Sequence, residues 1–271
     1  LEWLALTGNR LHKNGCVALA TLLQCSAADL QHLFISNRVI DDEGVEALVP
    51  ALANCNEIKR LNLSRNPSIT SRGWQRLATI LEAPNSSLEE LRISRNTVDD
   101  EAASALASAL TSNNKLRTIY LDENPSITAV GWQSFSNILC NTSSVNATFL
   151  SNHTLQRLND MRGDTIRVMH PLLRLNRRRN KKEVAAIKIL QTHDDFDMLP
   201  FLEWEFKVLP LVLGWLDRVS EYNMPEDFEP NIEERKLSTI YQFVRGMPVL
   251  YVENRLRKEL EDIKVAESQL E

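Results

Sequence analysis

Neither a long apolar run nor a cysteine pair occurs in this sequence. A membrane-spanning helix needs about 20 mostly apolar residues in succession, and no segment approaches that length, so we expect a soluble chain. The four cysteines form no CxxC pair and lie in or beside apolar segments. Such thiols behave as small hydrophobes, which predicts reduced, buried cysteines without a disulfide framework.

The motifs of several common enzyme classes are absent as well. The sequence has no GxGxxG, GxxxxGK[ST] or GxSxG motif, and its five histidines show no HxxxH or HxxE spacing. Three carboxylates cluster at Asp194, Asp195 and Asp197, but they lack the spaced oxygens and the glycine of a calcium loop. We therefore predict a protein that is not an enzyme and has no catalytic residues, metal site, cofactor or small-molecule substrate.

Charge of one sign is not in large excess either. Lys and Arg number 31 and Asp and Glu 36, which gives a net charge of −5. So mild a balance creates no global field to attract nucleic acid or an anionic membrane. With 43% hydrophobic and 25% charged residues, the composition is typical of a folded soluble protein, so any charge argument has to be local.

What the sequence does contain is a repeat. Six segments carry an aliphatic residue at position one and, with few exceptions, at positions four and six. They are LEWLALTGN from Leu1, LQHLFISNR from Leu30, IKRLNLSRN from Ile58, LEELRISRN from Leu88, LRTIYLDEN from Leu116 and VNATFLSNH from Val145. Their starts lie 29, 28, 30, 28 and 29 residues apart. A fixed period of this length is typical of solenoids, in which one supersecondary unit stacks on the next.

Each repeat has two parts with different periodicities. The first has apolar residues two apart, as at Leu33 and Ile35, which predicts a brief strand. The second, such as GVEALVPALANC from Gly44, has apolar residues three and four apart, which predicts an amphipathic helix. The pattern LxxLxLxxN followed by a helix resembles the leucine-rich repeats of the ribonuclease-inhibitor type, from Leu1 to about Leu158. That resemblance implies an α/β solenoid with parallel strands on its concave face.

Two nearly identical stretches indicate a longer period. NPSITSRGW begins at Asn66 and NPSITAVGW at Asn124, 124 − 66 = 58 residues later, and the intervening units carry DDE before the helix instead. The repeating object is therefore a pair of units. We expect helix N-caps at Asp42, Thr70 or Ser71, Asp100 and Thr128, recurrent packing by Trp74 and Trp132, and backbone-binding asparagines at Asn9, Asn66, Asn96 and Asn124.

Side chains alternate along a strand, so positions three and five should point away from the core, with position eight beside them. Aromatic residues and arginine supply most of the energy at protein interfaces. We therefore predict a partner-binding surface formed by Trp3, His32, Phe34, Arg60, Arg65, Arg92, Arg95, Tyr120 and Phe149. The predicted function is a non-catalytic protein–protein interaction module or scaffold, and a constitutive accessory subunit of a larger assembly is an alternative.

The repeat pattern stops after Leu158, and the composition changes. We divide the chain into a solenoid over residues 1–158 and a small all-α carboxy-terminal domain over 159–271, with helices over about 183–192, within 199–221, and over about 232–245 and 253–268. The segments HDDFDMLPFLEWEFKVLPLVLGWLDR and NIEERKLSTIYQFVRGMP resemble the carboxy-terminal helical tail of uncharacterised diatom leucine-rich repeat proteins. This resemblance implies an architecture and no activity.

One local cluster is strongly basic: Arg174, Arg177, Arg178, Arg179, Lys181 and Lys182. It makes an RNA- or ribonucleoprotein-associated role that uses phosphate contacts an alternative function. The absence of interleaved aromatic residues, which stack on bases, favours a solvated loop or helix start. For the compartment, we expect an intracellular protein, cytoplasmic or organellar. Leu1 opens in mid-pattern, so we also expect an upstream part, with any targeting peptide, to be missing.

Overall fold

The computed structural model describes residues 1–9, 11–25, 30–36, 40–159 and 164–193. Strands and helices alternate along the first five repeats. The elements are β1 (Trp3–Ala5), α1 (His12–Cys25), β2 (His32–Phe34), α2 (Asp42–Asn54), β3 (Arg60–Asn62), α3 (Ser71–Glu82), β4 (Glu90–Arg92), α4 (Asp100–Leu110), β5 (Thr118–Tyr120), α5 (Ala129–Leu139), α6 (Val145–Phe149), β6 (Arg157–Asn159), α7 (Asp164–Leu175) and α8 (Lys181–Thr192).

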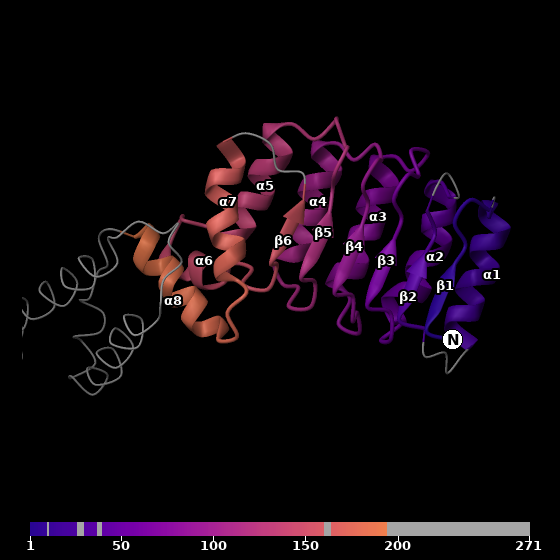
Figure 1. Ribbon diagram of the computed structural model, residues 1–271, viewed down its shortest axis with the longest axis horizontal. Coiled ribbons are helices and arrows are strands. Elements are labelled where there is room, and N and C mark those ends of the chain that lie inside the picture. The colour runs from indigo at the N-terminus through magenta and orange to yellow at the C-terminus, as the bar shows by residue number, and fades with distance from the viewer. Residues whose placement is uncertain (10, 26–29, 37–39, 160–163, 194–271) are drawn as a thin grey trace, which may run out of the picture. The chain divides into compact units, whose positions relative to one another are not determined.

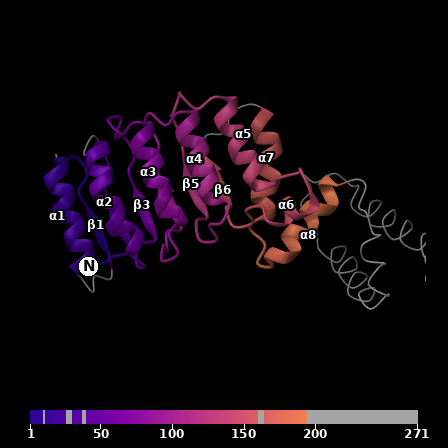
Figure 2. The same cartoon turned by 180° about the vertical axis from the view of Figure 1, so that it is seen from behind.

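The strands form one six-stranded parallel sheet in the order β1-β2-β3-β4-β5-β6. Position four of each strand pairs with position four of the next, as Leu33 pairs with Leu61 and Leu61 with Leu91. Figure 1 shows the strands side by side, with helices α1 to α5 in a second row, and Figure 2 shows the same two rows from behind. The described residues therefore form the α/β repeat solenoid that the period predicted.

The core lies between the sheet and the helices. Positions four and six are buried in units two to five, and the residues from Leu33 to Leu121 at these positions are at most 1% exposed. Each such side chain stabilises the stack by roughly 1.5–3 kcal/mol through burial. Cys16 also lies in this core, where desolvation, followed by the nearby charge of Asp41, raises the pKa of its thiol to about 11. This thiol therefore acts as a small hydrophobe.

Buried asparagines join consecutive repeats where each strand ends. Asn96 Nδ2 donates to Ile93 O of its own repeat at 2.8 Å and to Leu63 O of the preceding repeat at 3.1 Å. Its Oδ1 accepts from Asn66 N at 2.6 Å, and Asn124 Oδ1 in turn accepts from Asn96 N at 3.1 Å. Asn66 and Asn124 bind carbonyls in the same way, so the predicted asparagine ladder is confirmed.

The pairing of units arises from an aspartate that reaches into the next repeat. Asp100 Oδ1 accepts hydrogen bonds from Thr128 N at 2.7 Å and Gly131 N at 3.0 Å, and Oδ2 accepts from Thr128 Oγ1 at 2.6 Å. Asp42 binds Thr70 with the same geometry, 58 residues earlier. Partial burial alone would raise the pKa of Asp100, but the hydrogen bonds from Thr128 and Gly131 outweigh it and lower the pKa.

These contacts correct two predicted N-caps. The residues that cap α2 and α4 are Asp41 and Asp99, which accept from Gly44 N and Ala102 N. Asp42 and Asp100 are instead the first helical residues, so their carboxylates point towards the neighbouring repeat. Thr128 caps α5 as predicted, by accepting from Val130 N, whereas Thr70 precedes α3 without a side-chain capping bond.

The sixth repeat was predicted in the wrong register. Residues 145–149, where we expected a strand, form the short helix α6, with Ser144 as its N-cap. The sixth strand is Arg157–Asn159, which pairs with β5 so that Leu158 faces Ile119. Leu158 is 3% exposed, whereas Leu150, which the predicted register placed in the core, is 59% exposed. The insertion between α5 and β6 therefore lengthens this repeat.

The chain divides into two compact units, Leu1–Lys188 and Ile189–Glu271, and the contacts given below lie in the first. Helix α7 contacts α5 and β6, and α8 corresponds to the helix predicted over about 183–192. The helices predicted beyond residue 198 and the Asp194–Asp197 cluster lie outside the described residues, and the domain division at 158/159 stays a prediction. No helix in the described part has the length and apolar character to cross a membrane.

Candidate binding face

We define the strand face as the side of the sheet opposite the helices, formed by the side chains at positions three and five of β1 to β5 and by Arg157 at position three of β6. These side chains are exposed or half-buried, while position four is buried in β2 to β6. The face brings together six of the predicted site residues: Trp3, His32, Phe34, Arg60, Arg92 and Tyr120. Parallel in-register pairing places them in two adjacent columns.

The first part of the strand face is aromatic. Trp3 stacks on Phe34 with ring centroids 5.6 Å apart and an interplanar angle of 11°, and its centroid lies 4.0 Å from that of His32. Trp3 is nevertheless 55% exposed. Desolvation, followed by the charge of Arg60, lowers the pKa of His32, so His32 is neutral at neutral pH. This aromatic cluster of Trp3, His32 and Phe34 presents apolar surface to solvent.

The second part carries arginines arranged around one carboxylate. Glu90 lies 2.5 Å from Arg92 Nε and 3.8 Å from Arg60 Nε through its two oxygens. The guanidinium of Arg92 also lies over the Tyr120 ring, 4.9 Å from its centroid. Arg157 Nη1 donates to Tyr120 Oη at 3.4 Å. We call Arg60, Glu90, Arg92, Tyr120 and Arg157 the arginine cluster, and it contains three cations and one anion.

Position eight lies beside the face, in the turn after each strand. Arg65, Arg95 and Glu123 have φ angles of 61°, 59° and 55°, and Gly8 occupies the same position in the first repeat with φ 78°. The left-handed region is costly for a side chain with a Cβ. Arg95 and Glu123 are joined by an ion pair of 2.6 Å between neighbouring repeats. The structure therefore places Arg65 and Arg95 at the edge of the strand face.

Phe149 does not belong to this face, because it ends helix α6, where it is 50% exposed. In the sixth strand, Arg157 pairs with Thr118 at position three, and Asn159 pairs with Tyr120 at position five, where Phe149 was expected. Sequence reasoning missed Arg157 because the insertion shifted the last repeat. The segment Leu155–Asn159, with leucines three apart, carried the signal. The predicted set of site residues also left out Glu90, although the position of Glu90 in the repeat pattern places it on the strand face.

The predicted phosphate-binding residues lie around the turn between α7 and α8. Arg174 is in the last turn of α7, Arg177, Arg178 and Arg179 follow it, and Lys181 and Lys182 begin α8. Lys181 Nζ donates to Asn176 O at 2.6 Å and Arg178 O at 3.1 Å, so this ammonium closes the turn. A phosphate-binding role for the basic segment stays a prediction.

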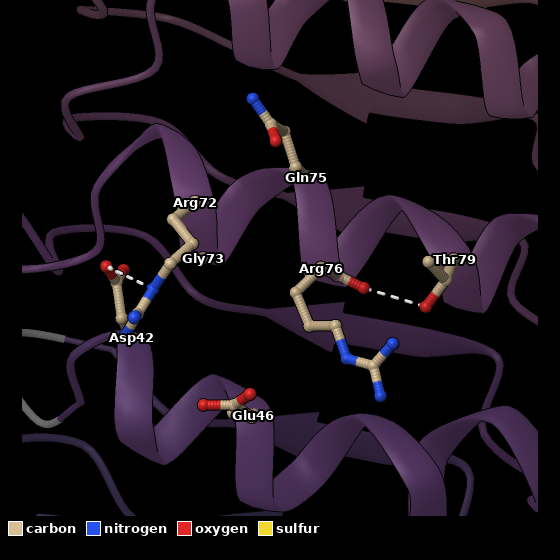
Figure 3. Close-up of a pocket in the computed structure, with 7 residues that line it drawn as sticks. All are labelled: Asp42, Glu46, Arg72, Gly73, Gln75, Arg76 and Thr79. Carbon is tan, nitrogen blue, oxygen red and sulfur yellow. Dashed lines mark hydrogen bonds and ion pairs between the residues drawn. The ribbon is translucent and has the colours of Figure 1, made fainter.

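A cleft of about 290 Å³ lies on the helix side, between α2 and α3. Figure 3 shows Asp42 and Glu46 on one helix and Arg72, Gly73, Gln75, Arg76 and Thr79 on the other, with Arg72 paired to Asp42 at 3.6 Å. Its charges are mixed, and no predicted site residue lines it. Within the described residues, no group of three His, Cys, Asp or Glu could hold a metal ion.

Comparisons with known proteins agree with this repeat architecture. A model described as a leucine-rich repeat matches residues 85–107. NACHT, LRR and PYD domains-containing protein 5 of Mus musculus is 31% identical over 125 residues, which cover 46% of this chain and 11% of the relative. The same protein of Homo sapiens is 30% identical over 125 residues, with 46% and 10% covered.

NACHT, LRR and PYD domains-containing protein 14 of Mus musculus is 31% identical over 111 residues, which cover 41% of this chain and 11% of the relative. The chain thus spans only about a tenth of the length of these relatives. A solved structure of leiomodin-1 actin-binding site 2 aligns with a TM-score of 0.49 at 15% identity, covering 60% of this chain and 87% of that one. The matched repeat model and the six stacked strands together support a leucine-rich repeat architecture for the described residues.

Proposed function

We propose that the protein is a non-catalytic binding module of the ribonuclease-inhibitor type, whose strand face holds a protein partner. The observation that carries this proposal is the exposed arginine cluster beside the aromatic cluster on one continuous sheet face. Tyr, Trp and Arg are the residues most enriched among interface hot spots. The names of the relatives include leucine-rich repeats, which agrees with an interaction role.

The geometry of Arg92 supports this proposal further. Its side chain is 43% exposed, but the guanidinium is already held between the Glu90 carboxylate and the Tyr120 ring. Ordering a flexible side chain on binding costs about 0.5–1.5 kcal/mol. Because Arg92 is held before a partner arrives, most of that cost is avoided. Its remaining N–H groups can donate to a carboxylate in bidentate fashion.

Charge defines the chemistry of the partner. Arg60, Arg92 and Arg157 outnumber the single carboxylate of Glu90 within the arginine cluster. A partner segment with carboxylates facing this cluster, and an apolar side chain facing Trp3 and Phe34, complements both parts of the face. We therefore propose an acidic segment with an apolar anchor as the bound element.

The proposal extends to the cell and the assembly. We propose that the module works inside the cell and has no enzymatic activity of its own, and that its partner belongs to a larger complex. One alternative is that the protein is a constitutive subunit of that complex, and an RNA-associated role through the basic segment of residues 174–182 is another. Native mass measurement of the protein from its cells tests the first alternative, because a constitutive subunit is never recovered as a monomer.

Site-specific crosslinking tests the strand face. A photo-crosslinking phenylalanine analogue replaces Tyr120 on the face or Phe149 on α6, and adducts formed in cells are identified by mass spectrometry. We expect one protein to be joined at position 120 and not at position 149. Its purified form should then lose at least tenfold in affinity for the Arg92→Ala, Tyr120→Ala double variant. The Phe149→Ala variant is the matched control and should bind normally.

Two results contradict the proposal. One is crosslinking of the same partner at position 149 and not at 120, which places the interface on another surface. The other is unchanged affinity of the double variant, provided that its circular dichroism spectrum and urea midpoint match those of the wild type. The double variant should fold, because both side chains lie on the exposed face and outside the core.

A further inference from the structure

A fully buried lysine lies where α8 meets the last repeat. Lys188 is 0% exposed, and its Nζ donates to Leu139 O at 2.6 Å and Asn152 O at 3.0 Å. Leu139 is the last residue of α5, and Asn152 lies between α6 and β6. Nζ also lies 3.1 Å from His153 Nδ1. One ammonium therefore joins three segments that are distant in sequence.

The neighbouring groups determine the protonation state of His153. Its Nε2 lies 3.0 Å from the carbonyl oxygen of Phe149, which can only accept, so Nε2 carries the proton. Nδ1 then has a lone pair and accepts from Lys188. A second proton on His153 would have to be added at Nδ1, and it would turn this acceptor into a donor aimed at the ammonium. Acid therefore replaces a hydrogen bond with repulsion between two cations.

We propose that Lys188 and His153 form an acid-sensitive latch, in which protonation of His153 undocks the start of α8 from the last repeat. The Leu139 carbonyl then loses its buried lysine donor, and the Asn152 carbonyl keeps its bond from Asn176 Nδ2 but loses the one from Lys188. Raising the pH does not open the latch, because a neutral amine gives up its bond to His153 Nδ1 but retains two N–H donors for these two carbonyls. The proposed state change thus runs in one direction, towards release below neutral pH.

The electrostatic environment of His153 and Lys188 also favours release of α8 at lower pH. Desolvation, followed by the charge of Lys188, lowers the pKa of His153 from 6.5 to about 4, with Lys181 acting in the same direction. Desolvation lowers the pKa of Lys188 from 10.5 to about 7, with a smaller lowering by Lys181 and an opposing contribution from Cys140. Both groups bind fewer protons when α8 is docked, so docking weakens as pH falls.

The pH window follows from these values. The contribution of His153 is fully present above about pH 6.5 and is lost progressively as the pH falls towards 4. For Lys188, docking strengthens from about pH 7 up to its ordinary value of 10.5. Between pH 7.5 and 5, linkage gives about a thirty-fold loss of docking equilibrium from His153 and about a four-fold loss from Lys188, so His153 supplies most of the change.

Amide hydrogen exchange on the full chain tests the latch. Rates are measured between pH 7.5 and 5 and divided by the intrinsic rate at each pH. We expect peptides within residues 181–188 to lose about a hundred-fold in protection, while peptides from α4 keep theirs. His153→Asn retains an acceptor near the place of Nδ1 but cannot titrate, so its loss should be at most a few-fold. His170→Asn is the matched control on the exposed surface of α7 and should behave as the wild type.

Three outcomes overturn the proposal. The first is constant protection of residues 181–188 in the wild type across this range. The second is an equal loss in the His153→Asn variant, and the third is a parallel loss in α4, which indicates general acid unfolding. If the asparagine variant does not fold, the wild-type comparison of α8 with α4 still decides. Lys188→Met provides a second variant, which should lose less protection than the wild type because the charge of Lys188 no longer lowers the pKa of His153.

Discussion

Replacement of Gly131 by alanine should destabilise the protein, although intrinsic helix propensity predicts the opposite. Gly131 lies in the first turn of α5, and alanine is favoured over glycine inside a helix by about 1 kcal/mol. A Cβ at this position would lie 2.6 Å from Asp100 Oδ1, 2.9 Å from Ile127 Cγ2 and 3.1 Å from Ala103 Cβ. The first two distances are shorter than carbon side chains tolerate, so the aspartate has to move.

The expected magnitude follows from what Asp100 loses when it moves. Its carboxylate accepts three hydrogen bonds, from Thr128 N, Thr128 Oγ1 and Gly131 N. Overpacking costs about 1–3 kcal/mol, and weakening of partly exposed carboxylate bonds adds about 1 kcal/mol. After subtraction of the propensity gain of about 1 kcal/mol, we expect Gly131→Ala to lower the free energy of unfolding by about 1–3 kcal/mol.

Urea unfolding followed by circular dichroism measures this change. The matched control is Gly15→Ala in α1, where the nearest atom to the new Cβ is Leu11 Cδ2, the end of a flexible side chain, at 2.9 Å. We expect that control to be neutral or stabilising by up to about 1 kcal/mol. In an Asp100→Ala background, the cost of Gly131→Ala should fall by about 1 kcal/mol, because the oxygen that it meets is gone.

Either of two results would refute this explanation of the paired repeats. If Gly131→Ala stabilises the protein as much as Gly15→Ala does, the close approach of Asp100 has no energetic consequence. If the coupling between Gly131→Ala and Asp100→Ala is below about 0.5 kcal/mol, the two residues act independently. The recurrence of Asp42, Thr70 and Gly73 in the preceding pair of units would then need another cause.

Two further substitutions test the asparagine ladder and the register of the last repeat. Asn96→Ala should cost about 3 kcal/mol in urea unfolding. It removes one of two asparagine donors from each of the buried Leu63 and Ile93 carbonyls, and it removes the acceptor of the Asn66 amide. Asn9→Ala, at an exposed position, should cost less than about 0.5 kcal/mol, and equal costs would contradict a role for burial. Leu158 is 3% exposed and Leu150 is 59% exposed. Leu158→Ala should therefore cost about 2–4 kcal/mol, and Leu150→Ala should cost less than about 0.5 kcal/mol. The reverse order of costs would support the predicted strand at 145–150 instead.

Much of the fold could be predicted from the sequence because its forces are local and periodic. Leucines at positions four and six, as at Leu61 and Leu63, can be buried only if successive units stack. The same argument placed Arg92 and Tyr120 on the opposite side of the sheet, where the structure has them. It failed after Leu139, because α6 and its neighbouring loops lengthen one repeat and a fixed period cannot foresee an insertion.

Only the tertiary structure determined the contacts between residues that are far apart in sequence. The period showed that units come in pairs, but not that Asp100 reaches Gly131 in the next helix. It placed Arg92 on the face, but not between Glu90 and Tyr120. No pattern joins His153 to Lys188, 35 residues away. A repeat fixes which side each residue faces, whereas the partner of a polar side chain depends on the three-dimensional distances that stacking creates.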